Sequence, residues 1–267
     1  MHIAWHPAFI EALKLELEEY IDLLEFHSEF LLSSEPLRID CVIIKKANDL
    51  VIKKNFASVF REVNLFEYKS PDDYVSVTDF YKVYGYACLY SSFEKVPITS
   101  LTVSFVESHY PRELLTHLSE IRKFKVEETN RGIYNVTGDI LPIQIIDSRQ
   151  LSAEENLWLQ GLNNNLDSNE IKRVLTEVYR QGKAARIQAY LFVITQANTY
   201  TVREAIKMSS ETLTLDQVFE ETGMAARWEE KKALAIAQNM VNLGLPLEII
   251  VSATKLDPEK VKALFNN

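Results

Sequence analysis

The stretch Arg38-Ile39-Asp40-Cys41-Val42-Ile43-Ile44 decides the fold class, because a short run rich in β-branched apolar residues predicts a strand. The residues Ala47-Asn48-Asp49 then predict a turn, and Leu50-Val51-Ile52 predicts a possible return strand. A second β-like run, Val63-Asn64-Leu65-Phe66-Glu67-Tyr68-Lys69, ends before the turn Ser70-Pro71-Asp72-Asp73. Asp40 stands within the first run, and Glu67 and Lys69 stand near the end of the second.

Helices are predicted on both sides of these strands. Apolar residues spaced by threes and fours predict an amphipathic helix over residues 8–32, which Pro36 ends. A helix over 78–91 precedes two further strands, at 99–106 and 140–146. The order α, β, β, β, α, β, with a further strand later, predicts an α/β fold with a mixed sheet. After Leu151 the predicted elements are all helical, at residues 152–162, 168–196, 201–208, 214–222, 225–243, 246–254 and 257–265.

The change from strands to helices predicts a domain boundary near residue 150. We expect an α/β domain over residues 1–150 and an all-α domain over residues 151–267. A length of 267 residues is enough for two domains of ordinary size.

Composition excludes several classes of protein. The chain has 7 glycines, and they form neither GxGxxG nor a P-loop, which excludes Rossmann oxidoreductases, kinases and P-loop NTPases. Its two cysteines, Cys41 and Cys88, cannot build a disulfide framework and favour a reducing compartment. The first twenty residues lack the features of a secretory signal, and the longest uncharged apolar stretch is far shorter than the roughly 20 residues of a membrane span. We therefore expect a cytoplasmic protein with no membrane partner.

The net charge of -9 is unevenly distributed along the chain. Residues 11–35 contain eight acids and one lysine, whereas residues 45–69 contain six bases and three acids. Local field, more than net charge, attracts phosphate. We therefore expect the lysines of a basic hairpin to contact nucleic acid, although a solvated hairpin tip explains them equally well. These lysines are Lys45, Lys46, Lys53 and Lys54.

The chemistry is predicted to lie where the two strands meet. Side chains alternate along a strand, so Glu67 and Lys69 point the same way. If Asp40 pairs near Glu67, two carboxylates converge, and a cation between them would relieve their repulsion. Hard oxygen ligands suit Mg²⁺ or Mn²⁺, which would leave Lys69 to orient the attacking water. The plainer alternative is that these charges form only exposed ion pairs.

Asp40 followed by Phe66-Glu67-Tyr68-Lys69, within the α, β, β, β, α, β order, resembles the D…(D/E)xK signature of the PD-(D/E)XK nuclease superfamily. The tail adds to the resemblance. Its segments Leu243-Gly244-Leu245-Pro246-Leu247-Glu248-Ile249-Ile250 and Ala253-Thr254-Lys255-Leu256-Asp257-Pro258-Glu259-Lys260-Val261 are similar to the C-terminal end of the bacterial recombination-promoting nuclease, or putative transposase, group. Many members of that group have Gln at the position of Lys69. The lysine of this chain departs from the group toward the classical superfamily pattern, and this favours catalysis.

The resemblance implies a restriction-endonuclease-like αβββαβ core followed by a helical C-terminal region. It implies an endonuclease that hydrolyses DNA in recombination or mobile-element processing, with Mg²⁺ or Mn²⁺ held by Asp40, Glu67 and the carbonyl of Tyr68. It also implies an acid on the first helix, where Glu11, Glu18 and Glu19 are eligible and Glu18 is our choice. The helix after Lys69 would add Tyr81 or Lys82, and we expect Lys82 to contact nucleic acid.

Two other functions remain open. The same fold could serve as a catalytically inactive binding or assembly module, with the helices between residues 168 and 265 as its working surface. A nuclease that acts on RNA is a weaker alternative, because no residue pattern here indicates contact with a 2′-hydroxyl. The last two short helices resemble a helix-turn-helix in size, but the second offers only Lys260 and Lys262 as bases. For these helices we therefore favour pairing of two copies, or docking within the chain, over the reading of a DNA groove.

Overall fold

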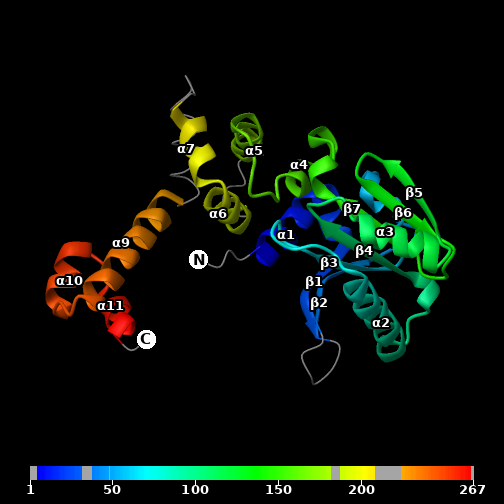
Figure 1. Ribbon diagram of the computed structural model, residues 1–267, viewed down its shortest axis with the longest axis horizontal. Helices are drawn as coiled ribbons and strands as arrows, with labels where there is room; N and C mark the ends of the chain where they lie inside the picture. The colour runs from blue at the N-terminus through cyan, green and yellow to red at the C-terminus, as the bar shows by residue number, and fades with distance from the viewer. Residues whose placement is uncertain (1–4, 32–37, 48, 182–186, 208–223, 266–267) are drawn as a thin grey trace. The chain divides into compact units, whose positions relative to one another are not determined.

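The computed structural model describes residues 5–31, 38–47, 49–181, 187–207 and 224–265 (Figure 1). The chain forms two compact units. The first comprises Met1–Val174 with Ala189–Ala205, and the second comprises Leu175–Gln188 with Ile206–Asn267. The fold is α/β, with a mixed sheet and a helical C-terminal region.

The first unit is built on one seven-stranded sheet, in the order β1-β2-β3-β4-β7-β6-β5. Strands β3, β4 and β7 are parallel to one another, and the other neighbours are antiparallel. Strand β2 therefore runs against β3, while β4 follows β3 through a helical crossover. The strands are β1 (Leu24–Leu31), β2 (Arg38–Lys45), β3 (Val63–Tyr68), β4 (Leu101–Glu107), β5 (Lys125–Asn130), β6 (Ile133–Thr137) and β7 (Ile143–Asp147).

Two helices cover opposite faces of the sheet. In α1 (Trp5–Glu16), the ring of Phe9 stacks on Tyr68 at 4.5 Å between centroids. In α2 (Val77–Glu94), Phe80 contacts Phe105, which is paired with Glu67 in the register of β3 and β4. Because neighbouring residues of a strand face opposite ways, Tyr68 points to α1 and Glu67 points to α2.

The other helices connect α1, α2 and the strands to one another or follow β7 in the chain. The predicted helix over 78–91 and the strands over 99–106 and 140–146 are confirmed with shifted ends, and the long helix predicted over 168–196 is two helices. No helix within the described ranges is both long and apolar enough to cross a membrane. The connecting and following helices are η1 (Glu18–Leu23), η2 (Asn55–Ala57), η3 (Ile98–Ser100), α3 (Arg112–Thr116), η4 (His117–Ile121), η5 (Ser148–Gln150), α4 (Ala153–Gln160), α5 (Ser168–Gln181), α6 (Gln188–Ala197) and α7 (Thr199–Lys207).

The second unit contains α9 (Met224–Asn242), α10 (Leu247–Thr254) and α11 (Pro258–Phe265). These three helices pack on a small apolar core of their own, and this bears out the predicted helices at 225–243, 246–254 and 257–265. Pairing of two copies through them stays a prediction. The helix predicted over 214–222 lies outside the described residues. The buried residues of the small core formed by α9, α10 and α11 are Ala237, Ile250, Leu256 and Val261.

Two predictions near the N-terminus were wrong. The helix predicted over 8–32 ends at Glu16, and residues 24–31 form β1, because pairing with β2 outweighs the helical spacing of the apolar residues. Residues 50–52, the expected return strand, form no strand and have no ladder partner, so the predicted basic hairpin is a loop between β2 and β3.

Sequence reasoning also missed the hairpin of β5 and β6, whose outward residues are polar. Its turn contains Gly132 with a φ of +76°, a left-handed conformation that L side chains rarely adopt. A Cβ at this position would lie 2.7 Å from the carbonyl oxygen of Asp147. Glycine is therefore required on both counts, and the turn packs against the end of β7.

The contacts of α1 continue across the boundary predicted near residue 150. Glu16 is 3% exposed. Its carboxylate accepts the backbone N–H of Trp158 at 2.8 Å and of Leu159 at 3.3 Å, and it pairs with Lys54. The backbone of α4 is not helical at Asn156, so these N–H groups begin a new turn that needs a cap. Burial raises the pKa of Glu16, although Lys54 opposes that effect. A separation of the chain near residue 150 stays a prediction.

We predict that Glu16→Ala lowers the free energy of unfolding by about 3 kcal/mol, because it leaves a lysine and two buried N–H groups without their acceptor. Urea denaturation measures this change. The matched control is Glu11→Ala, which removes only the pair with Lys14 on the same helix and should cost less than about 1 kcal/mol. Equal losses in the two variants would show that Glu16 does not join α1 to α4.

Candidate functional site

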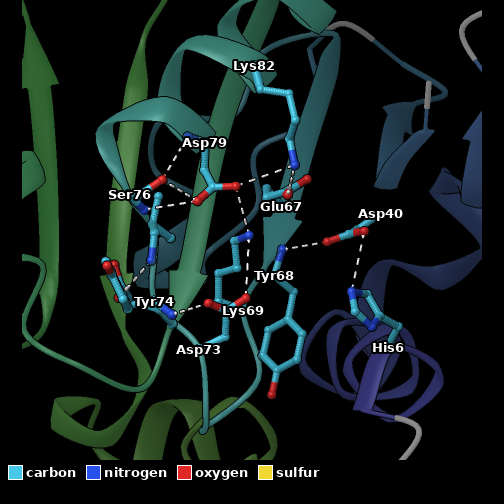
Figure 2. Close-up of polar contacts among 12 residues, drawn as sticks. His6, Asp40, Glu67, Tyr68, Lys69, Asp73, Tyr74, Ser76, Asp79 and Lys82 are labelled. Atoms are coloured by element: carbon cyan, nitrogen blue, oxygen red, sulfur yellow. Dashed lines mark hydrogen bonds and ion pairs between the residues drawn. The ribbon is translucent and has the colours of Figure 1, made fainter.

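The site begins where the ladder between β2 and β3 ends. The last pair of that ladder is Cys41 with Phe66, and the same register continued by one residue places Asp40 opposite Glu67. The amide of Tyr68 donates to Oδ2 of Asp40 at 2.8 Å, so a side chain takes the place of a ladder carbonyl. Figure 2 shows this contact, together with His6 of α1, whose Nε2 lies 3.5 Å from Oδ1 of Asp40.

Glu67 is the most buried charged group of the site, with 7% of its side chain exposed. Its Oε1 lies 3.2 Å from Nζ of Lys82 on α2. Burial raises the pKa of Glu67 to about 7, and the negative charge of Asp40 acts in the same direction, while Lys82 and Lys69 oppose it. Burial, with a smaller contribution from Asp40, therefore makes Glu67 easily protonated at neutral pH.

Asp79 brings both lysines of the site together. Its Oδ1 lies 2.9 Å from Nζ of Lys69 and 3.5 Å from Nζ of Lys82 (Figure 2). Partial burial acts to raise the pKa of Asp79, but hydrogen bonds from Ser76 and Lys69 outweigh it and lower the pKa to about 2. Lys69 is also 3.6 Å from Asp73, and these carboxylates raise its pKa against the effect of burial. Both groups are therefore charged at neutral pH.

The start of α2 fixes Asp79 in place. Ser76 is the N-cap, and its hydroxyl accepts the N–H of Asp79 at 3.0 Å. In return Asp79 accepts the N–H of Ser76 at 3.1 Å, which completes a capping box. Asp79 therefore both completes the capping box of α2 and pairs with Lys69.

The structure brings together four of the residues predicted for the site: Asp40, Glu67, Lys69 and Lys82. Glu18 begins η1 beyond the end of α1, and its place in the site stays a prediction. The α1 residue that contacts Asp40 is His6. Sequence reasoning missed both His6 and Asp79. The pattern Ser76-x-x-Asp79 is a capping signal, and it could have indicated Asp79 before the structure was known.

The four lysines predicted to contact nucleic acid lie outside this cluster of contacts. Lys54 pairs with buried Glu16 and has a structural role. Lys45 donates to the carbonyl of Leu50, and Lys46 donates to the carbonyl of Asp22. Lys46 and Lys53 have exposed side chains. A role of the four lysines in binding DNA stays a prediction.

The oxygen atoms available to a metal ion are few. Asp40 and Glu67 offer carboxylates, and the carbonyl of Tyr68 follows Glu67 directly in the chain. In the described part of the chain, no three residues of the types His, Cys, Asp and Glu form a metal-binding group. The binding of Mg²⁺ or Mn²⁺ by these residues stays a prediction.

We predict that Glu67 makes stability depend on pH. A carboxyl whose pKa rises from 4.5 to about 7 on folding holds a proton that the unfolded chain releases, so stability falls as the pH rises across this interval. Glu67→Gln removes this loss. The difference in unfolding free energy, variant minus parent, should increase between pH 5 and pH 8 by on the order of 2 kcal/mol.

Urea denaturation at each pH measures the difference. The control is Glu94→Gln, which changes an exposed carboxylate at the end of α2 and should leave the pH profile unchanged. A Glu67→Gln profile parallel to that of the parent would mean that Glu67 ionises at its ordinary pKa and that the burial described above has little electrostatic effect.

Comparison with protein-family models, with curated proteins and with solved structures finds no match to this chain. A function must therefore be argued from the geometry of the site.

Proposed function

We propose that the protein is a metal-dependent endonuclease of the PD-(D/E)XK type that hydrolyses DNA, in recombination or in the processing of mobile elements. The observation that supports it most is the position of Asp40 opposite Glu67 at the end of the β2–β3 ladder. There the Tyr68 amide holds Asp40, and Lys69 follows two residues after Glu67.

The order of the elements supports the proposal. Helix α1 precedes three strands, β1 to β3, which pair as an antiparallel meander. Helix α2 then crosses to β4, which is parallel to β3. This is the arrangement expected of a restriction-endonuclease-like αβββαβ core, with Asp40 on the second strand and Glu67-Tyr68-Lys69 at the end of the third.

The residues present fit Mg²⁺ or Mn²⁺. Asp40, Glu67 and the carbonyl of Tyr68 would hold the ion, since all three present hard oxygen atoms. Oδ2 of Asp40 accepts the Tyr68 amide, so a ligand would bind at Oδ1, which lies 3.5 Å from Nε2 of His6. Such an ion, when bound, supplies a water of lowered pKa and polarises the phosphate.

The chain's own residues then have distinct roles. Glu67 would give up its proton and its contact with Lys82 on becoming a ligand, because the added positive charge favours its ionised form. Lys69, held by Asp79, would orient the attacking water and offset charge on the phosphate. Lys82 would be released toward the DNA backbone, which agrees with its 41% exposed side chain. Exposed Lys46 and Lys53 would extend the contact with phosphates.

An inactive binding or assembly module is the second candidate. Lys82 already pairs with Glu67, and Asp79 already pairs with Lys69. A site closed in this way needs no ion. The two candidates differ in what a divalent cation does to the protein.

We predict that Asp40→Asn and Glu67→Gln each reduce Mg²⁺-dependent nicking of supercoiled DNA by about 100-fold or more, because each removes an anionic group that acts on the reacting phosphate through the ion. Circular dichroism should show an intact fold in both variants. Nicking rates are measured with DNA, and parallel reactions with RNA test the weaker alternative.

Glu94→Gln is the matched control, since it removes an exposed carboxylate outside the site. It should nick DNA like the parent. A parent protein that nicks neither DNA nor RNA at any Mg²⁺ or Mn²⁺ concentration would refute the endonuclease and favour the module. Unchanged nicking in both site variants would place the activity elsewhere.

A further inference from the structure

A second polar site lies beside the one described above. The loop after β3, residues 71–75, and the residues that end and follow β4, Glu107 and 109–113, line an open cavity of about 350 Å³. Asp73 belongs to the cavity wall and also lies 3.6 Å from Lys69. The cavity thus adjoins the site of Asp40 and Glu67 but is lined by other residues.

Glu107 gives the cavity a buried carboxyl group, and burial raises the pKa of this group to about 7. It is the last residue of β4 and is 0% exposed. Its Oε2 accepts the N–H of Val75 at 3.2 Å, whereas its Oε1 has no hydrogen-bond partner among the described residues. A buried carboxylate oxygen without a donor costs free energy. A ligand that donates a hydrogen bond at this point would recover that cost.

The charge of the wall selects the sign of the ligand. The negative groups outnumber the positive ones, so a phosphate or another anion would be repelled. Two tyrosines, Tyr74 and Tyr110, are 58% and 49% exposed and line the same cavity. The faces of these aromatic rings carry partial negative charge and attract a cation. Four carboxylates, of Asp72, Asp73, Glu107 and Glu113, stand against the guanidinium of Arg112 and the ring of His109.

A bare metal ion fits this wall less well than an organic cation. Glu107 is the only one of the four carboxylates that is buried, and no three candidate ligands come together in the described part of the chain. Aromatic rings and Pro71 form much of the remaining wall. Such a wall packs against an alkyl chain or a flat cation and offers little to a hydrated metal ion.

We propose that this cavity binds an organic cation, a guanidinium or primary ammonium group on a short chain, that donates to Oε1 of Glu107 and packs against Tyr74 and Tyr110. The carrier is either a free small molecule or an arginine or lysine side chain of a protein partner. The inference does not rest on the proposed endonuclease activity, because Glu107 has no part in the metal site.

Isothermal titration of the full chain with agmatine tests the proposal, and N-acetyl-arginine amide and an arginine-containing tripeptide separate the two sources. Agmatine should bind saturably with one site per chain, and inorganic phosphate should not compete. Tighter binding of the peptide than of agmatine would identify a protein partner. Glu107→Gln should weaken binding at least tenfold, whereas Glu94→Gln should leave it unchanged.

A second variant serves if Glu107→Gln does not fold. Tyr74→Ala changes an exposed side chain and should weaken agmatine binding about fivefold through loss of the ring contact. No saturable binding of agmatine or of the peptides to the parent would overturn the proposal. Unchanged affinity in the Gln variant, or competition by phosphate, would also overturn it.

Discussion

The arrangement of the site depends on the hydrogen bond from the Tyr68 amide to the carboxylate of Asp40. The β2–β3 ladder stops one residue before Asp40, and this bond replaces the ladder contact that is missing there. It keeps Asp40 at the end of the sheet, opposite Glu67. If the ladder continued, a backbone carbonyl of β2 would accept the Tyr68 amide, and Oδ2 of Asp40 would lose this donor.

The electrostatics of the site follow from that geometry. Burial and the nearby charge of Asp40 favour the protonated form of Glu67, and Lys82 compensates only in part. On the other side, the capping box of α2 makes Asp79 strongly acidic, and Asp79 holds Lys69. The site therefore combines one carboxyl that is easily protonated with a lysine that stays charged. In the proposed endonuclease, the cation would bind near Glu67 and the phosphate of the substrate would lie near Lys69.

The sequence was sufficient to predict the parts of the fold that rest on local pattern. Strand β2, strand β3 and helix α2 were predicted from their apolar periodicity and turn residues, and Asp40, Glu67 and Lys69 were singled out because they are charges within such strands. Strand β1 was mistaken for helix, since its apolar residues also fit a helical spacing and only its pairing with β2 decides the matter.

Contacts between distant segments could not be predicted in the same way. The bond of Glu16 to the backbone of α4 joins residues 142 positions apart, and the sequence around Glu16 contains no sign of it. Lys54 pairs with the same Glu16. Because this pairing is not visible in the sequence, Lys54 was grouped with its basic neighbours as a DNA contact. His6 reaches Asp40 only because α1 packs across β3.

The most direct test of the account is a crystal soaked in Mn²⁺ and measured for anomalous scattering. If the proposed metal site exists, one peak should appear with oxygen atoms of Asp40 and Glu67 at about 2.1 Å, and Lys82 should have moved away from Glu67. Crystals that show no peak at saturating Mn²⁺, with Lys82 still bound to Glu67, would contradict it.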